Sequence, residues 1–534
     1  MTLSLEQPGA DLYESIPYPK LSHKRTHPDR LGTLGGLLGM EPAPVENCRV
    51  LELGCAQGSN LIPMAYRLPN SRFVGLDYAA IQIEDGQRDI ARLGLENIEL
   101  VQGDILSPPD DLGQFDYIIA HGVWSWVPQP VRLALLTLIR DHMAPQGIAY
   151  VSYNVYPGWH MVNVIRDLMR YRTRHIDDPQ EQVRLAKEVV HFMNKAIPED
   201  ESALGHFIGR YVDGILAGRM ESGFAGDSFM LHDELSLVND PCYFHEFYKM
   251  AQQHGLQYLT EAVFSSVIPN YLPEPIIAGL QEMSAGLVDM EQYLDYINNR
   301  SFRQTLLCHK EVTVQRRLKP NLMLDRYYSS RAHPEQAERP EATEVKRFRG
   351  TDGASLTSNH PLSQAAFRVL IEQAPRVFSF RELVEEALRL APLDQTESLD
   401  QHTFQLAASL LQAYSYSGSL VDLHSYQPHI VTEISERPLA SDIARWQAEH
   451  GFNVTNLLHE RIILDNTFRF MVRHLDGTRT VDDLVALLQD VYDQGELRFK
   501  DDENADAFES LEERLAHETR RNLAVLKRAA LLIG

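Results

Sequence analysis

The sequence predicts an α/β protein built around a Rossmann-like, open parallel sheet, with a helical insertion and with smaller winged-helix-like and helical modules behind it. Two observations support this fold class. Between residues 49 and 77 an apolar strand, a glycine turn, a helix and a second strand ending in an acid follow one another, which is the order of a nucleotide-binding βαβ unit. Strand-like and amphipathic helix-like segments then keep alternating up to residue 154, a pattern typical of a parallel sheet covered on both faces.

An arm of residues 1–47, rich in proline, histidine and tyrosine, precedes the sheet. Tyr13 and Tyr18 stand beside prolines, and tyrosine combines an apolar ring with a polar tip. We therefore expect the arm to lie over the active site; the alternative is a disordered leader. The sheet domain is expected over residues 48–330 and begins with strand 49–53, helix 59–67, strand 72–76, helix 80–92, strand 97–102, strand 115–120, helix 129–143 and strand 147–154.

The glycine turn indicates the class of ligand. A dinucleotide needs Gly-x-Gly-x-x-Gly to seat its pyrophosphate, whereas this turn reads Gly54-Cys55-Ala56-Gln57-Gly58 and follows Glu52. The Glu52 carboxylate would repel a pyrophosphate but could orient an ammonium group. With Asp77 and Asp104 it stands at the ends of three successive predicted strands, where open parallel sheets bind their ligands. S-adenosylmethionine fits these acids, because it has an amino-acid tail, a ribose and an adenine but no phosphate.

These residues resemble the class I S-adenosylmethionine-dependent methyltransferases. More narrowly, the chain is similar to methyltransferases with a regulatory domain, a family that includes the rickettsial outer-membrane-protein lysine methyltransferases. Two positions depart from that family: Ser59 replaces the second glycine of a pair before Asn60, and Trp124 stands where tyrosine is common. The narrower resemblance covers the first three fifths of the chain and rests on residues 13–19, 26–31, 51–63, 121–128, 153–160, 243–247, 255–259 and 299–309.

The pattern and the resemblance together nominate site residues. The expected cofactor-binding residues are Glu52, Gly54, Cys55, Ala56, Gly58, Asn60, Asp77, Tyr78, Gln82, Asp104, Ile105, His121 and Gly122. Methyl transfer from a sulfonium needs alignment rather than a covalent enzyme intermediate, and aromatic faces stabilise cations. The expected catalytic residues are therefore Tyr13, Tyr18, His121, Trp124, Trp126, Tyr156 and Trp159.

Beyond residue 158 a helical tract at about 159–222 exceeds what such a sheet needs, so we expect an insertion that supports a homodimer. The regulatory region, about 223–310, is expected to complete the same sheet. It should supply a helix at 241–254, antiparallel strands at 256–264 and 302–309, and a helical pair at 275–298.

The C-terminal part is expected to begin with a linker at 331–359, rich in Glu, Pro, Ser and Thr. Helices at 362–372, 380–389 and 404–415, with a hairpin of 418–423 and 430–432, suggest a winged-helix-like module at 360–435. Its second and third helices carry few basic residues, which favours contact with protein over DNA. Residues 436–534 are expected to form a helical module that ends in a helix at 505–532.

Composition narrows the function. The chain has 534 residues, a net charge of −24 and 44% hydrophobic residues, which suits a soluble protein of several domains and disfavours nucleic acid as a partner. No apolar run reaches the roughly eighteen residues of a membrane span. The N-terminus shows no secretory signal, and the four cysteines lack the spacing of a zinc site or disulfide framework. We expect a cytoplasmic enzyme without a metal.

The resemblance implies a protein lysine amine as the methyl acceptor. Two alternatives stay open: a small-molecule or peptide N- or O-methyltransferase, and a non-catalytic scaffold that binds the cofactor. The intact Glu52, Asp77 and Asp104 disfavour the scaffold.

Overall fold

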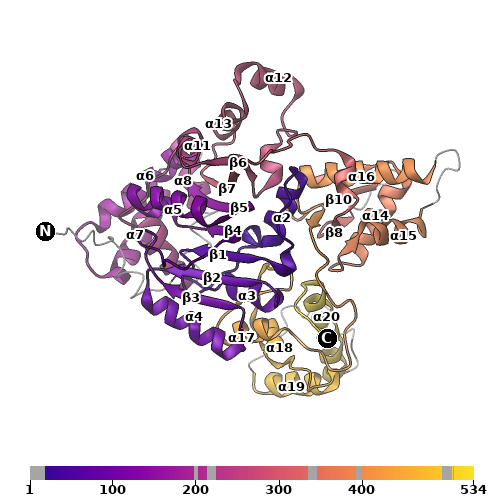
Figure 1. Cartoon of the computed structure of the whole chain (residues 1–534). Helices are drawn as coiled ribbons and strands as arrows, with labels where there is room; N and C mark the ends of the chain where they lie inside the picture. The colour runs from indigo at the N-terminus through magenta and orange to yellow at the C-terminus, as the bar shows by residue number, and fades with distance from the viewer. Residues whose placement is uncertain are drawn as a thin grey trace.

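A seven-stranded sheet with the order β3-β2-β1-β4-β5-β7-β6 lies at the centre of the first three fifths of the chain (Figure 1). The computed structural model describes residues 18–197, 202–212, 224–334, 346–391, 398–495, 508 and 510–534. The first five strands pair in parallel, and β7 is antiparallel to both β5 and β6. This topology confirms the predicted fold class. The strands are β1 (Arg49–Leu53), β2 (Arg72–Asp77), β3 (Ile98–Gln102), β4 (Phe115–Ala120), β5 (Met143–Asn154), β6 (Leu256–Glu261) and β7 (Phe302–His309).

Both faces of the sheet are covered, so the central strands are almost continuously buried. Alternate residues point to opposite faces: Val50 and Tyr117 belong to one hydrophobic core, and Leu51 and Ile118 belong to the other. The first core also contains residues of α2, α3 and α4, and the second contains residues of α5 and α11. These helices are α2 (Pro28–Leu37), α3 (Leu61–Arg67), α4 (Ala80–Leu93), α5 (Gln129–His142) and α11 (Phe244–Gln253).

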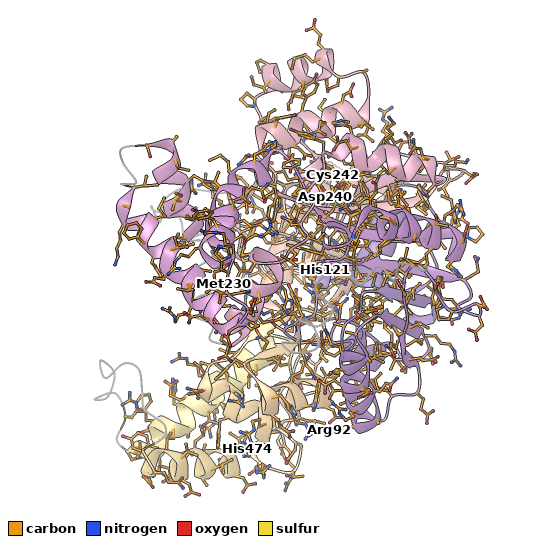
Figure 2. The ribbon with its side chains drawn as sticks, turned by 90° about the vertical axis from the view of Figure 1, so that its left-hand side faces the viewer. Arg92, His121, Met230, Asp240, Cys242 and His474 are labelled. Atoms are coloured by element: carbon orange, nitrogen blue, oxygen red, sulfur yellow. The ribbon has the colours of Figure 1, made fainter. Side chains whose placement is uncertain are left out.

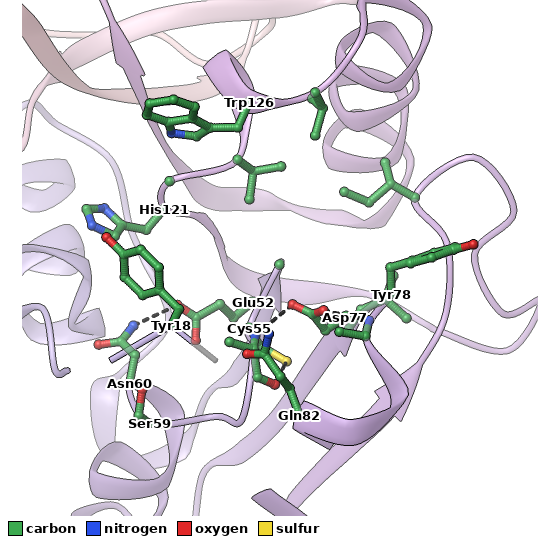
Figure 3. Close-up of a pocket in the computed structure, with 18 of the residues that line it drawn as sticks. Tyr18, Glu52, Cys55, Ser59, Asn60, Asp77, Tyr78, Gln82, His121 and Trp126 are labelled. Carbon is green, nitrogen blue, oxygen red and sulfur yellow. Dashed lines mark hydrogen bonds between the residues drawn. The ribbon is translucent and has the colours of Figure 1, made fainter. Parts of the chain in front are cut away.

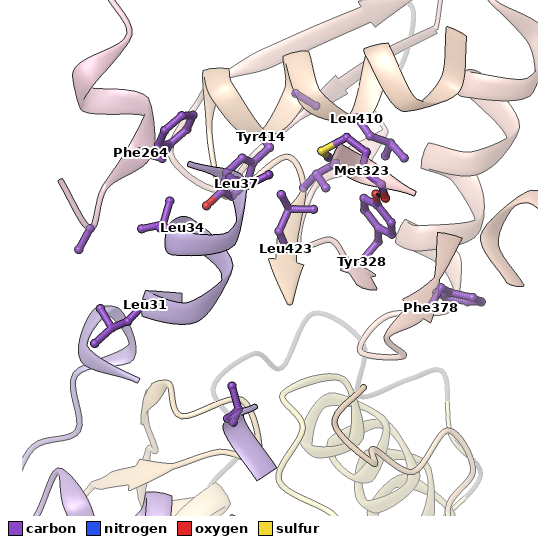
Figure 4. Close-up of a cluster of buried hydrophobic side chains, with 14 of the residues drawn as sticks. Leu31, Leu34, Leu37, Phe264, Met323, Tyr328, Phe378, Leu410, Tyr414 and Leu423 are labelled. Carbon is purple, nitrogen blue, oxygen red and sulfur yellow. Dashed lines mark hydrogen bonds between the residues drawn. The ribbon is translucent and has the colours of Figure 1, made fainter. Parts of the chain in front are cut away.

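The described part of the arm is integral to the fold from Lys24 onward. After the 3₁₀ turns η1 (Lys24–Thr26) and, further on, η2 (Val45–Asn47), the chain enters the sheet. Between the two turns, Leu31 and Leu34 of α2 are fully buried. Figure 4 shows α2 beside Phe264 and Tyr414, which come from much later in the chain. The arm therefore joins the sheet to the C-terminal part, in addition to reaching the cavity described below; Tyr13 lies outside the described residues.

The helical insertion has a small core of its own, formed by residues such as Ile165, Val183 and Met230. Figure 2 shows Met230 set apart from His121 of the sheet. Its described elements are α6 (Gly158–Thr173), α7 (Pro179–Ala196) and α8 (Ala203–Tyr211). The regulatory region begins with α10 (Phe224–Phe229) and the π-helix η6 (Met230–Glu234), which adds Met230 and Leu231 to this core. The regulatory region then contributes α11, β6, η7 (Phe264–Val267), α12 (Glu274–Met283), α13 (Leu287–Ile297) and β7.

Two expectations about residues 331–435 are wrong. The proposed linker contains three short strands that pair with one another, β9 (His333–Pro334), β10 (Lys346–Arg349) and β11 (Ser355–Ser358). The expected hairpin does not form either, because β13 (Asp422–His424) pairs with β8 (Tyr327–Ser329), and residues 430–432 are not a strand. The hairpin does not form because the chain after β13 binds to the arm instead. The Ser425 amide donates to Asp29 Oδ1 of α2 at 2.7 Å, so the chain continues along α2 after β13 ends. The remaining elements here are η8 (Pro320–Met323), α14 (Pro361–Glu372), β12 (Phe378–Ser379), α15 (Phe380–Leu388) and α16 (Leu399–Tyr416).

The described residues of the C-terminal module (436–495, 508 and 510–534) pack beside α3 and α4 (Figure 1). Arg92 at the end of α4 forms an ion pair with Glu449 of this module, and Figure 2 shows Arg92 and His474 on neighbouring parts of the molecule. A two-stranded hairpin was not expected here. The module consists of α17 (Asp442–His450), β14 (Asn453–Thr455), β15 (Arg461–Ile463), α18 (Asn466–His474), α19 (Val481–Asp493) and α20 (Leu511–Arg528). Across the described ranges, none of the helices has the length and apolar character needed to cross a membrane.

Candidate active site

A cavity of about 260 Å³ opens at the carboxyl ends of β1 to β4 (Figure 3). Every residue predicted to bind the cofactor lines it except Gly58. Of the predicted catalytic residues, Tyr18, His121 and Trp126 line it. The cavity also has walls that the sequence did not suggest, namely Pro19, Leu21, His23, Ser59, Leu76, Ala79, Gly103, Val123, Val127, Val131 and Asp233.

The glycine turn forms the cavity floor. Its backbone adopts positive φ angles and packs closely, so only residues with small side chains fit there. Gly54 has φ +71° and Ala56 has φ +49°, both in the left-handed region that disfavours most L-residues. A Cβ atom on Gly54 would lie 2.5 Å from Val123 Cγ2. Gly58, with φ +72°, faces Leu100 instead of the cavity, so it shapes the turn without lining the site.

The Asp77 carboxylate accepts hydrogen bonds from two segments that line the cavity, the glycine turn and the start of α4. Its Oδ2 accepts the Ala56 amide at 2.7 Å, and its Oδ1 accepts the Ala79 amide at 2.9 Å. Burial raises the pKa of Asp77, while these backbone donors counteract the rise. A carboxylate has about four lone-pair positions, so two backbone bonds leave capacity for a ligand. Asp104, after β3, holds its own turn by accepting the Leu106 amide at 3.0 Å.

Glu52 is a buried acid with unused bonding capacity. Its Oε1 accepts from Asn60 Nδ2 at 2.8 Å, whereas its Oε2 has no hydrogen-bond partner in the part of the chain that the structure describes. Burial raises the pKa of Glu52 to about 8. An unpaired buried oxygen is costly, and a ligand ammonium placed here would satisfy it. The acid therefore fits the amino-acid tail of S-adenosylmethionine.

Two neighbouring imidazoles, tilted by 41° to one another, form one end of the cavity wall. The rings of His23 and His121 lie 4.0 Å apart between centroids, and His121 Nδ1 lies 3.0 Å from the Tyr150 hydroxyl and 3.2 Å from Ser152 Oγ. Burial lowers the pKa of His23 to about 4 and that of His121 well below its ordinary value. Both rings are therefore neutral at pH 7. No local sequence signal marks His23, because it reaches the site from the arm.

The other predicted aromatic residues lie elsewhere. Trp124 is fully buried in the second core, edge-on to Phe247 at 4.9 Å, so its assignment to the catalytic site is corrected. Trp159 does not line the cavity but packs edge-on to Trp126 at 6.4 Å. Tyr156 also lies outside the cavity lining and stacks on His160 at 4.1 Å.

The charge of the cavity selects for cationic ligands. Its described lining includes the acids Asp77, Asp104 and Asp233, and Glu52 adds a further negative charge once a ligand ammonium displaces its proton; no Lys or Arg is among the residues that line it in the described ranges. A ligand with a net negative charge would meet repulsion here, whereas a sulfonium or an ammonium would be attracted. The site can hold a cation at the glycine turn and an uncharged base at the imidazole end.

Three protein families match the chain in succession. Residues 44–201 match a methyltransferase domain, residues 226–309 match a predicted methyltransferase regulatory domain, and residues 436–531 match the PKMT C-terminal winged-helix domain. The winged-helix match therefore falls on the module for which only helices were expected, and not on residues 360–435.

Individual proteins match over longer stretches. The chain is 31% identical over 494 residues to the uncharacterised protein RP789 of Rickettsia prowazekii, covering 91% of this chain and 87% of that protein. RP028 of the same organism is 33% identical over 247 residues, which are 46% of this chain and 96% of that protein. The solved structure of PKMT2 from Rickettsia typhi in complex with AdoHcy has a TM-score of 0.86 and 28% identity, covering 97% of this chain and 100% of that chain.

Proposed function

Since the chain belongs to the family of class I S-adenosylmethionine-dependent methyltransferases with a methyltransferase regulatory domain and a PKMT winged-helix domain, we propose that its acceptor is the side-chain amine of a protein lysine. The predicted family, enzyme class and cofactor are confirmed by these matches. The acceptor and the roles of individual residues go beyond them and are argued from the cavity.

The three acids supply a place for each part of the cofactor. The unpaired Oε2 of Glu52 would hold the tail ammonium, Asp77 would accept from the ribose hydroxyls, and Asp104 would accept from the adenine amino group. When bound, S-adenosylmethionine supplies an electrophilic methyl group on a sulfonium. The task left to the protein is to align an acceptor and to keep water away from it.

The observation that carries the lysine proposal is the combination of acidic walls with a neutral imidazole end. An acceptor amine arrives as a cation, and the carboxylates attract it. It must lose a proton before it can attack, and the uncharged His121 can accept a hydrogen bond from the neutral amine and so orient it. Trp126 and Tyr18 offer aromatic faces that favour an ammonium or its methylated product. An acidic small molecule would be repelled by the same walls.

The test uses full-length protein and methyl-labelled S-adenosylmethionine with two preparations of the same lysine-rich acceptor protein. One preparation is untreated, and the other has its lysines acetylated beforehand. We expect label only in the untreated acceptor, recovered as methyllysine after hydrolysis. Label in the acetylated acceptor, or label in an added small-molecule fraction alone, would contradict a lysine acceptor while leaving the methyltransferase assignment intact.

A further inference from the structure

We propose that His459 of the C-terminal module is a positioning residue for the cofactor site, where it acts through Asn60 on Glu52. The inference rests on the cofactor site proposed above. It gives the C-terminal module a part in methyl transfer, although the module lies outside the sheet that forms the cavity floor.

Asn60 is the link between the two parts. It directly precedes α3, lines the cavity and is buried. Its Nδ2 donates to Glu52 Oε1 at 2.8 Å, and its Oδ1 lies 2.9 Å from His459 Nε2. His459 and Asn60 are 399 residues apart in sequence, and His459 does not line the cavity itself.

The direction of each bond follows from the backbone. Asn60 Oδ1 also accepts the His23 amide at 2.9 Å, and a backbone N–H can only donate, so this atom is the amide oxygen. His459 must therefore carry its proton on Nε2 and donate. Thr26 Oγ1 accepts the other proton of Asn60 Nδ2 at 2.9 Å. With the oxygen held by His459 and His23 and one N–H held by Thr26, the remaining N–H of Asn60 is turned toward Glu52. The orientation of Glu52, and hence of its free Oε2, depends on this chain of bonds.

His459 is built into its position rather than lying there by chance. It is buried and has φ +58° in the turn between β14 and β15, a conformation that costs energy in a residue other than glycine. Asn456 Oδ1 closes the turn by accepting the amides of Leu458 at 2.9 Å and Glu460 at 2.8 Å. Burial keeps the pKa of His459 well below its ordinary value, so the ring stays neutral.

The β14–β15 hairpin that carries His459 also forms hydrogen bonds with the arm that lines the cavity. Lys24 donates to Glu460 at 2.7 Å, and Thr455 Oγ1 donates to Ser22 Oγ at 3.1 Å. These contacts flank His23, which forms part of the cavity wall. A matched control is His474 of the same module, whose Nδ1 lies 2.8 Å from the Phe470 carbonyl oxygen and which does not line the cavity.

The experiment measures binding of S-adenosylhomocysteine to the full-length protein by calorimetry. His459→Leu fills the buried volume without a donor, His459→Asn tolerates the left-handed backbone but is too short to reach, and His459→Gln can place an amide near the Nε2 position. We expect the first two to weaken binding by about three- to tenfold, the worth of one net hydrogen bond. His459→Gln should restore most of the affinity, and His474→Leu should leave it unchanged.

A double-mutant cycle decides whether Asn60 carries the effect. In an Asn60→Ala background, His459→Leu should cause no further loss of affinity. An equal loss in both backgrounds, or unchanged binding in all His459 variants, would overturn the proposal. If the donor-less variants do not fold, the Nε2–H resonance of His459 in the unaltered protein decides, because it must shift when S-adenosylhomocysteine binds. Absence of binding to the unaltered protein would count against the proposed site instead.

Discussion

Binding of S-adenosylhomocysteine should expel a proton from Glu52. The free protein holds this acid with a pKa of about 8 because it is buried, so at pH 7 about nine molecules in ten carry the proton. A tail ammonium at Oε2 favours the carboxylate and drives the proton off. Binding at pH 7 should therefore release about 0.9 proton, and the affinity should rise by almost tenfold per pH unit below pH 8.

Calorimetry in two buffers with different ionisation enthalpies measures the released proton directly. Glu52→Gln is the matched control. Binding to this variant involves the same titrating groups of protein and ligand, including the ligand amine, except for the Glu52 carboxyl itself. In that variant the proton release attributed to Glu52 should vanish, and affinity should be lower at pH 8. Equal binding heats in both buffers for the unaltered protein would refute the placement of the ammonium at Glu52.

The same acid should make the free protein less stable as the pH rises. The pKa of Glu52 lies above its ordinary value of 4.5, so the folded state holds a proton that the unfolded chain has lost. The stabilisation that Glu52 contributes to the free energy of unfolding is fully present below about pH 4.5. It declines by about 1.4 kcal/mol for each pH unit as the pH rises to about pH 8. Glu52→Gln should remove this slope in denaturant titrations, and an identical slope in the variant would contradict it.

Four further predictions concern the cavity and the assembly. Asp77→Asn should weaken S-adenosylhomocysteine binding by tenfold or more in calorimetry, because its NH₂ group would face the donor amide of Ala56; unchanged affinity would count against the ribose assignment. Removing residues 1–18 should reduce turnover far more than melting temperature, since α2 and its core remain; full turnover would exclude a role in closing the site. Trp126→Ala should likewise lower turnover more than stability, and an equal loss of both would indicate a packing role. The insertion at 159–222 should support a homodimer, so light scattering at micromolar concentration should give the mass of two chains. The mass of one chain would contradict this prediction.

The sequence was sufficient for the acids because their placement is local. Glu52, Asp77 and Asp104 each follow a strand, and parallel strands bring their carboxyl ends to one edge of a sheet. Residues that reach the site from distant segments have no such local sequence signal. His23 and His459 are examples. The two tryptophans at 124 and 126 share one short 3₁₀ turn, and the sequence could not tell which would enter the core. The expected hairpin after β13 was wrong for a similar reason, since α2 takes the place of the second strand.

The burial of α2 sets when this enzyme becomes complete during synthesis. Asp29 on α2 bonds to His424, which lies 395 residues later in the chain. At ribosomal elongation rates that interval lasts on the order of 20 to 80 seconds. During that time the apolar face of α2 lacks partners such as Tyr414 and Leu423, which belong to the same hydrophobic core. Tyr18, Pro19, Leu21 and His23, a few residues before α2, line the cavity, so a nascent or truncated chain should carry a nearly complete sheet but an unfinished site.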